Sequence, residues 1–284
     1  MSGVLRDAFK ITNNCIVLTI PLIIFVKTLD LYSMFSKYHM DTTPKFLIAS
    51  ITILFMFCIF FAGWFFMVKD AVLLSKKVFV LDKDRAKETL NLFKSLLDGV
   101  GKFFLPFFGA CLFYIFVIQV IAVQIVCMIG SRIIGALDEA SMQSVHELTL
   151  SSAVSDNSAM MTMIDNMTPE QIVFFGKWSL LFMVVTSLIM YLLMIWFPEI
   201  IYKRYNPIKA LGTSILKLLK DFKNSFVIFF ILWIIGFVIL FANTFALINP
   251  FAYLIISIIM FYFVTYAAVS IFLYYDRYFG EQNE

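Results

Sequence analysis

Apolar residues gather in six long runs along the chain, separated by shorter polar stretches. A helix of about 20 mainly apolar residues crosses the roughly 30 Å hydrocarbon core of a bilayer. The pattern therefore predicts an all-α, polytopic membrane helical bundle, organised as a single transmembrane domain over residues 1–284. The six transmembrane helices are expected at about 12–35, 46–68, 103–129, 171–202, 225–248 and 251–275.

Two polar stretches have the periodicity of an amphipathic helix. Between about 84 and 98, and again between about 207 and 222, apolar residues recur every three or four positions and basic residues occupy the other side. This pattern is typical of helices that lie in the membrane interface. Gly99 and Gly101 follow the first stretch and predict a bend into the third span. If the protein moves or senses a lipid, movement is expected at this bend.

The two amphipathic stretches also match one another in register. The match predicts a direct repeat of membrane helix, surface helix and membrane helix, with the copies related by an axis along the membrane normal. The alternative is convergence of two basic amphipathic helices. A shift of 122 positions places Lys87, Leu96, Leu97, Phe104, Phe107 and Phe108 on Lys209, Leu218, Leu219, Phe226, Phe229 and Phe230.

Three residues refine the predicted spans. Pro21 lies inside the first apolar run, where its ring and missing N–H predict a kink. Trp64 lies near the end of the second span, as residues of an interfacial aromatic belt do. Pro106 falls in the first turn of the third span, where a missing N–H costs little.

Composition independently indicates a membrane protein. The chain is 62% hydrophobic and 14% charged, against about 45–50% and 25% in soluble domains. A net charge of +3 gives no reason to expect nucleic acid as a partner. The four cysteines all lie in apolar runs and are interpreted as small buried hydrophobes, neither disulfides nor metal ligands. They are Cys15, Cys58, Cys111 and Cys127.

The distribution of positive charge predicts the orientation. With six spans, 17 of the 22 lysines and arginines fall on the side of the two termini and both amphipathic stretches. The positive-inside rule then places that side, and both termini, in the cytoplasm. The polar segment 131–169 is expected to be extracytoplasmic.

No catalytic motif accompanies this architecture, so the protein is not expected to be an enzyme or to hold a metal or other cofactor. Three carboxylates fall at predicted cytoplasmic helix ends, each close in sequence to a basic residue, and interfacial ion pairs are expected there. The carboxylates are Asp70, Glu199 and Asp276, and their flanking bases are Lys69, Lys203 and Arg277.

Uncharged polar residues are the candidates for a ligand site within the spans. An interior rich in aromatic residues and lacking charge suits a lipid or another amphiphile. Such polar side chains also hydrogen-bond neighbouring helices, which is the alternative interpretation. The residues expected to line a cavity between the repeats are Gln119, Gln124, Asn243 and Tyr262.

The basic residues around the amphipathic stretches are candidate contacts for anionic headgroups of the inner leaflet. Each juxtamembrane cation contributes about 1 kcal/mol of attraction to an anionic surface. They also serve as positive-inside determinants, and the two roles are compatible. The residues are Arg85, Lys87, Lys94, Lys102, Lys209, Lys217, Lys220 and Lys223.

A family resemblance rests on three stretches of sequence, AKETLNLFKSLLDGVGKFFLPFF, IKALGTSILKLLKDFKNSFVIFF and AAVSIFLYYDRYF. These resemble bacterial six-helix membrane proteins related to the membrane domain of some glycerophosphoryl diester phosphodiesterases. The resemblance implies a location in the bacterial inner membrane. The phosphodiesterase chemistry belongs to a separate soluble domain, so no catalytic residue carries over.

Three functions follow as hypotheses. The first is a membrane protein that handles or transports a lipid or amphiphile. The second is a non-catalytic structural or assembly subunit, with a homo-oligomeric or membrane-complex partner. The third is the permease subunit of an ATP-driven transporter, whose cytoplasmic helices dock an ATPase.

Overall fold

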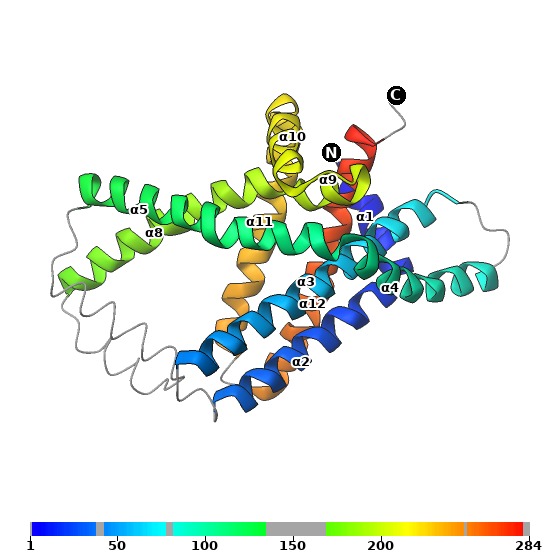
Figure 1. The fold of residues 1–284 in the computed structure, drawn as a ribbon, viewed down its shortest axis with the longest axis horizontal. Coiled ribbons are helices and arrows are strands. Elements are labelled where there is room, and N and C mark those ends of the chain that lie inside the picture. The colour runs from blue at the N-terminus through cyan, green and yellow to red at the C-terminus, as the bar shows by residue number, and fades with distance from the viewer. Residues whose placement is uncertain (1, 38–42, 78–81, 135–168, 247–248, 281–284) are drawn as a thin grey trace. The chain divides into compact units, whose positions relative to one another are not determined.

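A computed structural model describes residues 2–37, 43–77, 82–134, 169–246 and 249–280 (Figure 1). Every regular element in these ranges is helical. The predicted extracytoplasmic loop at 131–169 falls largely outside the described residues. The elements are α1 (Ser2–Asn14), the 3₁₀ helix η1 (Ile16–Leu18), α2 (Thr19–Lys37), α3 (Thr43–Leu74), α4 (Asp82–Phe113), the π-helix η2 (Tyr114–Ile118), α5 (Gln119–Ile133), α8 (Pro169–Leu193), α9 (Trp196–Lys203), α10 (Pro207–Lys220), α11 (Phe222–Ala246) and α12 (Pro250–Phe279).

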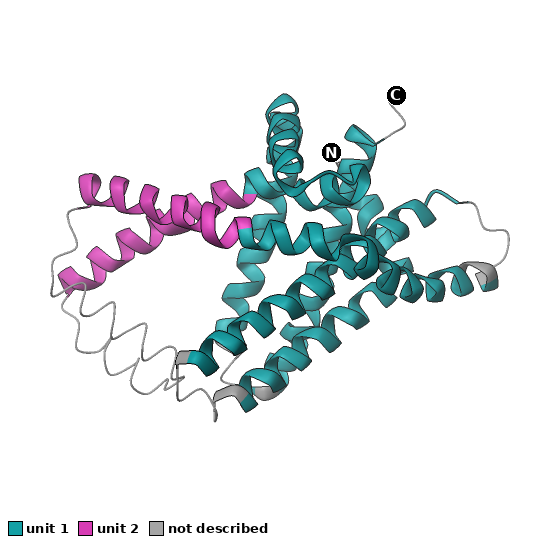
Figure 2. Ribbon diagram, viewed as in Figure 1, with its two compact units in different colours: residues 1–112, 191–284 teal, residues 113–190 magenta. Residues whose placement is uncertain are grey.

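The chain divides into two compact units (Figure 2). Unit 1 comprises residues 1–112 and 191–284, and unit 2 comprises residues 113–190. Unit 2 contains η2, α5 and most of α8, and its two long helices approach closely at Gly130, where an added Cβ would lie 2.3 Å from the ring of Trp178. The remaining helices, which carry both chain ends, belong to unit 1.

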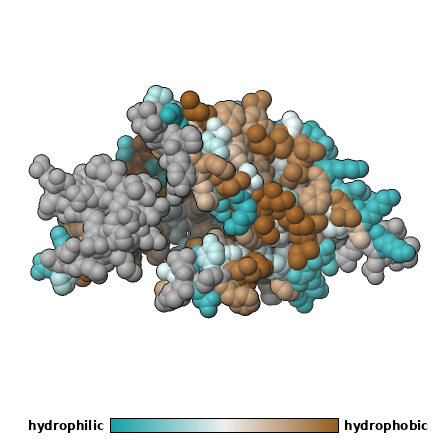
Figure 3. Space-filling view, turned by 90° about the horizontal axis from the view of Figure 1, so that it is seen from below, coloured by the Kyte–Doolittle hydropathy of each residue, from teal (hydrophilic) through white to brown (hydrophobic). Residues whose placement is uncertain are grey.

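Within the described residues, six helical stretches are long and apolar enough to span a membrane, which confirms the all-α polytopic class. Large apolar side chains on these helices, Ile48 and Phe241 among them, are more than half exposed. The space-filling view shows such apolar residues gathered in brown, with hydrophilic residues in teal at their edge (Figure 3). The stretches are Ile16–Phe35, Pro44–Leu74, Ala86–Ile133, Pro169–Lys203, Phe222–Thr244 and Phe251–Phe279.

The first span departs from the single kinked helix predicted over 12–35. Helix α1 ends at Asn14, and α2 begins only at Thr19 after the short η1. Pro21 explains the interruption, because it has no N–H for the carbonyl four residues earlier, at Val17, and its ring collides with that carbonyl. The proline itself then lies in the first turn of α2, where no N–H is needed.

The same geometry interrupts the predicted fourth span, 171–202. Helix α8 ends at Leu193 and α9 begins at Trp196. Pro198 lies in the first turn of α9, four residues after Met194, which is in the break. Each of these two prolines therefore interrupts the helix at the residue four positions before it. Each is itself accommodated in the first turn of the next helix.

The predicted bend at Gly99 and Gly101 is wrong, because α4 runs through both glycines without interruption. Gly99 instead lies against α3, where a Cβ would come within 2.6 Å of the Phe66 Cβ and 2.9 Å of the Gly63 Cα. Gly63 is equally constrained, since its Cβ would lie 2.4 Å from the Leu96 carbonyl oxygen. The two glycines allow α3 and α4 to pack backbone against backbone.

The continuity of α4 also corrects the placement of Pro106. The proline lies inside α4, not in a first turn. The second amphipathic stretch differs, because a break at Asp221 separates α10 from α11. The order of elements in the two predicted copies is alike, but their connections are not, and the duplication stays a prediction.

Aromatic side chains form the core of unit 1. The Phe65 ring lies 5.3–5.9 Å from the rings of Phe107, Phe197 and Phe272, and so joins α3, α4, α9 and α12. Trp64 is only 1% exposed, and its indole N–H donates to the Leu18 carbonyl oxygen at 2.8 Å. The prediction that Trp64 belongs to an interfacial belt is therefore wrong. It satisfies a backbone carbonyl at the break in the first span.

Helices α3 and α12 are among those that are longer than a bilayer requires. The 32 residues of α3 and the 30 residues of α12 measure about 45–48 Å at 1.5 Å per residue, against a hydrocarbon core of about 30 Å. The last turns of both helices lie at the end of unit 1 that carries the chain termini. These turns can therefore project beyond the hydrocarbon and accommodate charged residues.

Candidate functional site

The polar end of unit 1 is formed by α1, the C-terminal turns of α3 and α12, the start of α4, α9 and α10. Helices α1 and α12 meet there, because the Arg277 guanidinium donates to the Asp7 carboxylate at 2.6 Å (Figure 1). Helix α1 continues along α12, where the Tyr262 hydroxyl donates to the Asn13 side chain at 2.6 Å. The buried charged side chains of unit 1 lie at this end.

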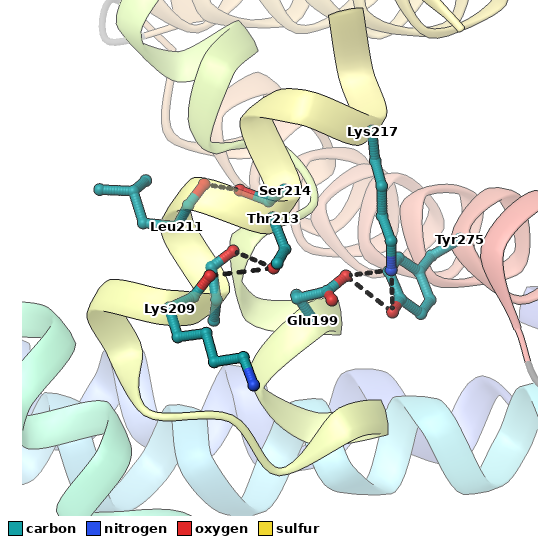
Figure 4. Close-up of polar contacts among 8 residues, drawn as sticks. Glu199, Lys209, Leu211, Thr213, Ser214, Lys217 and Tyr275 are labelled. Atoms are coloured by element: carbon teal, nitrogen blue, oxygen red, sulfur yellow. Dashed lines mark hydrogen bonds and ion pairs between the residues drawn. The ribbon is translucent and has the colours of Figure 1, made fainter. Parts of the chain in front are cut away.

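A buried ion pair fixes α10 to the bundle (Figure 4). The Glu199 carboxylate of α9, 1% exposed, accepts hydrogen bonds from Lys217 Nζ at 2.7 Å and from the Tyr275 hydroxyl at 2.8 Å. Lys217 Nζ also donates to the Tyr275 hydroxyl oxygen at 3.1 Å. The three groups link α9, α10 and α12, so that one carboxylate receives donors from two other helices.

Two of the three carboxylates at the helix ends bind cations from other parts of the chain, whereas Asp70 accepts a hydrogen bond from the Ser95 hydroxyl. Glu199 is bound by Lys217, and Asp276 is bound by Lys76 at 2.6 Å. The predicted pairing of Asp276 with Arg277 is wrong, because Arg277 binds Asp7 instead. Adjacent residues on a helix point about 100° apart, so a side chain and its sequence neighbour rarely face the same partner.

A cavity of about 760 Å³ opens at this polar end. Its walls come from α1, from the end of α3 with the turn that follows it, from α4 and from α12. The charged residues that line it are four cations and two carboxylates, Lys10, Lys76, Lys77, Arg277, Asp7 and Asp276. Ile11, Leu74 and Leu273 contribute buried apolar surface to the same walls.

The four polar residues predicted to line a cavity fall in different units. Gln119 and Gln124 belong to unit 2, and Asn243 and Tyr262 belong to unit 1. Gln119 donates to the Tyr114 hydroxyl at 2.5 Å within unit 2, and Tyr262 binds Asn13 of α1. The Tyr262–Asn13 contact joins two helices, as the alternative interpretation expects, whereas the Gln119–Tyr114 contact lies within one helical stretch. That the four line one cavity stays a prediction.

Most of the predicted headgroup contacts point into solvent or lipid. The side chain of Arg85 lies outside the described residues. Lys217 differs from the others, since its ammonium group is held inside the bundle by Glu199 and Tyr275 and is not presented to a headgroup. The exposed members of the set are Lys87, Lys94, Lys102, Lys209, Lys220 and Lys223.

Helix α10 presents an amphipathic surface outward. Its inner face is buried at Ala210, Ser214 and Leu218. Its outer surface carries large apolar side chains that are more than half exposed, beside exposed lysines. The apolar residues are Ile208, Leu216 and Leu219, followed by Phe222 at the start of α11, and the lysines are Lys209 and Lys220.

Sequence reasoning missed α1 and the cavity that α1 lines. A signal was present, because Val4, Ala8, Ile11 and Cys15 follow the i, i+4, i+7 and i+11 spacing of a buried helix face, and all four are buried. The adjoining apolar run obscures this pattern, because by itself it predicts one helix that begins at about residue 12. The ion pairs that shape the cavity join residues far apart in the sequence, and no local pattern reveals them.

The Asp7–Arg277 pair predicts a pH dependence of stability. The hydrogen bond from Arg277 is the main cause that holds the pKa of the Asp7 carboxyl below its ordinary value of 3.8. A lowered folded-state pKa stabilises the protein at pH values above 3.8, and this contribution is lost as the pH falls through the lower folded-state pKa. Because both side chains are about one-third exposed, the contribution is at most about 1 kcal/mol.

We therefore expect wild-type protein to be slightly more stable than Asp7→Asn at pH 7, with the difference vanishing in acid. The measurement is the thermal unfolding midpoint of both proteins in detergent between pH 7 and about pH 2, because the difference is lost only below the folded-state pKa, which is itself below 3.8. A difference that persists at the lowest pH would show that the substitution acts by some route other than this charge.

No family model, curated protein or solved structure matches this chain. Its class therefore rests on its own architecture. Six long apolar helices define a multi-pass integral membrane protein.

Proposed function

We propose that this protein binds and handles lipids or other amphiphiles at the cytoplasmic surface of the bacterial inner membrane, without catalysing a reaction. The observation that supports it is the outer surface of α10. Exposed apolar side chains there adjoin exposed lysines, an arrangement that places a helix between acyl chains and anionic headgroups. Helix α10 is also held rigidly on the bundle by Glu199, so lipid contacts made by it act directly on the helices that pack around that carboxylate.

The positive charge at this end supports the same proposal. Lys87 and Lys94 on the first half of α4, and Lys209 and Lys220 on α10, are all exposed. At about 1 kcal/mol for each cation near an anionic surface, these four would enrich anionic lipid around the protein several-fold or more. The positive-inside rule assigns this end to the cytoplasm.

The experiment is gentle extraction into lipid nanodiscs or native-membrane particles, followed by native mass spectrometry of the lipids retained. We expect wild-type protein to retain anionic phospholipid in excess of its share of the membrane. The variant Lys209→Gln/Lys220→Gln should retain about tenfold less of it, because two headgroup contacts are lost.

The matched control is Lys83→Gln/Lys177→Gln, which removes the same charge at two exposed lysines away from α10 and should leave lipid retention unchanged. If anionic lipid is retained equally by wild type and by the α10 variant, α10 is not a lipid-binding element. If no lipid is enriched on any of the three proteins, lipid handling is the wrong function and a structural or assembly role replaces it.

A further inference from the structure

The cavity at the polar end of unit 1 has unequal numbers of positive and negative groups. Each of its two carboxylates already has a cation. Arg277 binds Asp7 and Lys76 binds Asp276, both at 2.6 Å. Two of the four cations are thereby neutralised within the cavity wall, and the other two are Lys10 and Lys77.

Lys10 and Lys77 have no protein counter-charge in contact. Both side chains are exposed, and within the described part of the chain neither makes a hydrogen bond or an ion pair. Lys10 acts on Asp7 only through the longer-range field that helps to lower the pKa of Asp7. Among the described residues that line the cavity, two ammonium groups therefore remain without a counter-charge in contact, which gives this lining a net charge of about +2.

We propose that this cavity binds a phosphate group between Lys10 and Lys77. Lysine is a common ligand of phosphate, and two lysines match the charge of a phosphate monoester. A metal ion fits this lining less well than an anion, because both carboxylates already bind cations and the described residues contain no group of three or more His, Cys, Asp or Glu that could hold a metal. This inference extends the proposed function. It rests on that function in one respect only, namely that the phosphate belongs to an amphiphile.

The cavity walls match a phosphate ester that carries an apolar body. A volume of about 760 Å³ lies within the range of about 300–1,000 Å³ usual for small-molecule sites. Ile11, Leu74 and Leu273 supply buried apolar surface beside the lysines, and Asn14 adds a side-chain amide as a further donor. Charged and apolar groups therefore face the same space, as the two ends of an amphiphile require.

The position of the cavity relative to the spans agrees with this ligand. The lining residues that come from α1 and its end precede the first span, which begins at Ile16. The lining also includes Leu74, the last residue of the second span. It also includes Arg277, two residues before the end of the sixth span. The cavity lies where three spans leave the apolar region, which is the level at which phospholipid phosphates lie.

The test measures binding of two probes to the purified full-length protein in an uncharged detergent. The probes are inorganic phosphate and a short-chain phosphatidic acid, and the matching short-chain diacylglycerol is the uncharged control. Calorimetry or the ligand dependence of the thermal midpoint gives the dissociation constant. We expect Lys10→Gln/Lys77→Gln to raise it by about tenfold or more, whereas Lys10→Arg/Lys77→Arg keeps the charge and retains binding.

Lys83→Gln/Lys177→Gln removes the same charge at two exposed lysines outside both the cavity and α10 and should leave binding of both probes unchanged. Equal weakening by the cavity variant and this control variant would overturn the proposal, because binding would then follow net charge. It would also be overturned if neither probe bound wild-type protein. A phosphatidic acid that binds far more tightly than inorganic phosphate identifies a lipid headgroup as the source, and equal binding identifies a free phosphate compound.

Failure here is distinct from failure of the proposed function. If Lys209→Gln/Lys220→Gln loses anionic lipid while wild-type protein binds neither phosphate probe, lipid binding at α10 stands and the cavity assignment falls. If the cavity binds phosphate and no lipid is enriched on wild-type protein, the cavity assignment stands and lipid handling falls.

Discussion

Replacing Lys217 by methionine is expected to lower the free energy of unfolding by about 3–5 kcal/mol, the largest effect of any single substitution considered for this protein. Methionine retains the apolar length of the side chain but removes the ammonium group that binds Glu199 at 2.7 Å. The Glu199 carboxylate, 1% exposed, would then be buried with only the Tyr275 hydroxyl as a donor. Burying a charge without a partner costs far more free energy than the intact ion pair contributes to stability.

The measurement is thermal or denaturant unfolding in detergent, followed by circular dichroism. Lys220→Met makes the same change one turn along α10 at an exposed position, and it should be nearly neutral. The double variant Glu199→Gln/Lys217→Met leaves no buried charge and should recover most of the lost stability. If Lys217→Met and Lys220→Met are equally stable, the ion pair does not hold α10 on the bundle.

Gly99→Ala and Gly101→Ala should change stability in opposite directions. An added Cβ at Gly99 would meet the Phe66 Cβ at 2.6 Å and the Ala62 carbonyl oxygen at 2.9 Å. Forcing α3 and α4 apart by one methyl group costs about 1–3 kcal/mol. At Gly101 no atom lies within 4 Å of an added Cβ, so alanine stabilises the helix by about 0.5–1 kcal/mol through its better propensity.

Because both substitutions make the same chemical change two residues apart in one helix, each is the control for the other. Unfolding midpoints of the two variants and the wild type in one detergent settle the sign. A hinge at these glycines predicts instead that both alanines stiffen the segment and change stability alike. Equal shifts of the two midpoints would therefore favour the hinge over the tight crossing of α3 and α4.

The six spans were predictable because a bilayer constrains composition directly. A backbone in hydrocarbon must satisfy its hydrogen bonds within a helix, so a long uncharged run such as 46–68 has one structural solution. The ends of spans were less predictable. Helix α3 continues to Leu74 because its last turns pack against other helices, where the half-buried Asp70 accepts a hydrogen bond from the Ser95 hydroxyl of α4, and so need not be apolar. Hydropathy detects the part of a helix in lipid and misses the part covered by protein.

The irregular positions required knowledge of neighbouring helices. Pro21 predicts a disturbance, but its location at residues 15–18 depends on whether the chain breaks before the proline or kinks around it. The Trp64 indole, bound to the Leu18 carbonyl oxygen, stabilises the break from another helix. Gly99 looks like a flexible residue in the sequence, and only the presence of Gly63 opposite makes it a packing contact.

The candidate site was the least predictable part. The sequence shows where lysines are, and six of the eight predicted headgroup contacts are exposed. It does not show which cations are neutralised. Lys217 and Lys76 pair with carboxylates on other helices, whereas Lys10 and Lys77 do not. Such a distinction depends on distances of a few ångströms between helices, which periodicity does not encode.

The packing of α1 on α12 has a consequence for synthesis of the chain. The Asn13–Tyr262 and Asp7–Arg277 contacts join residues 249 and 270 positions apart. At about 5–20 residues per second, the partners of α1 emerge ~10–50 s after α1 itself. Helix α1 therefore waits for α12, and this part of the bundle closes only after α12 has been made. Until then the face of α1 that includes Val4, Ala8 and Ile11, buried in the folded protein, lacks its partner helix.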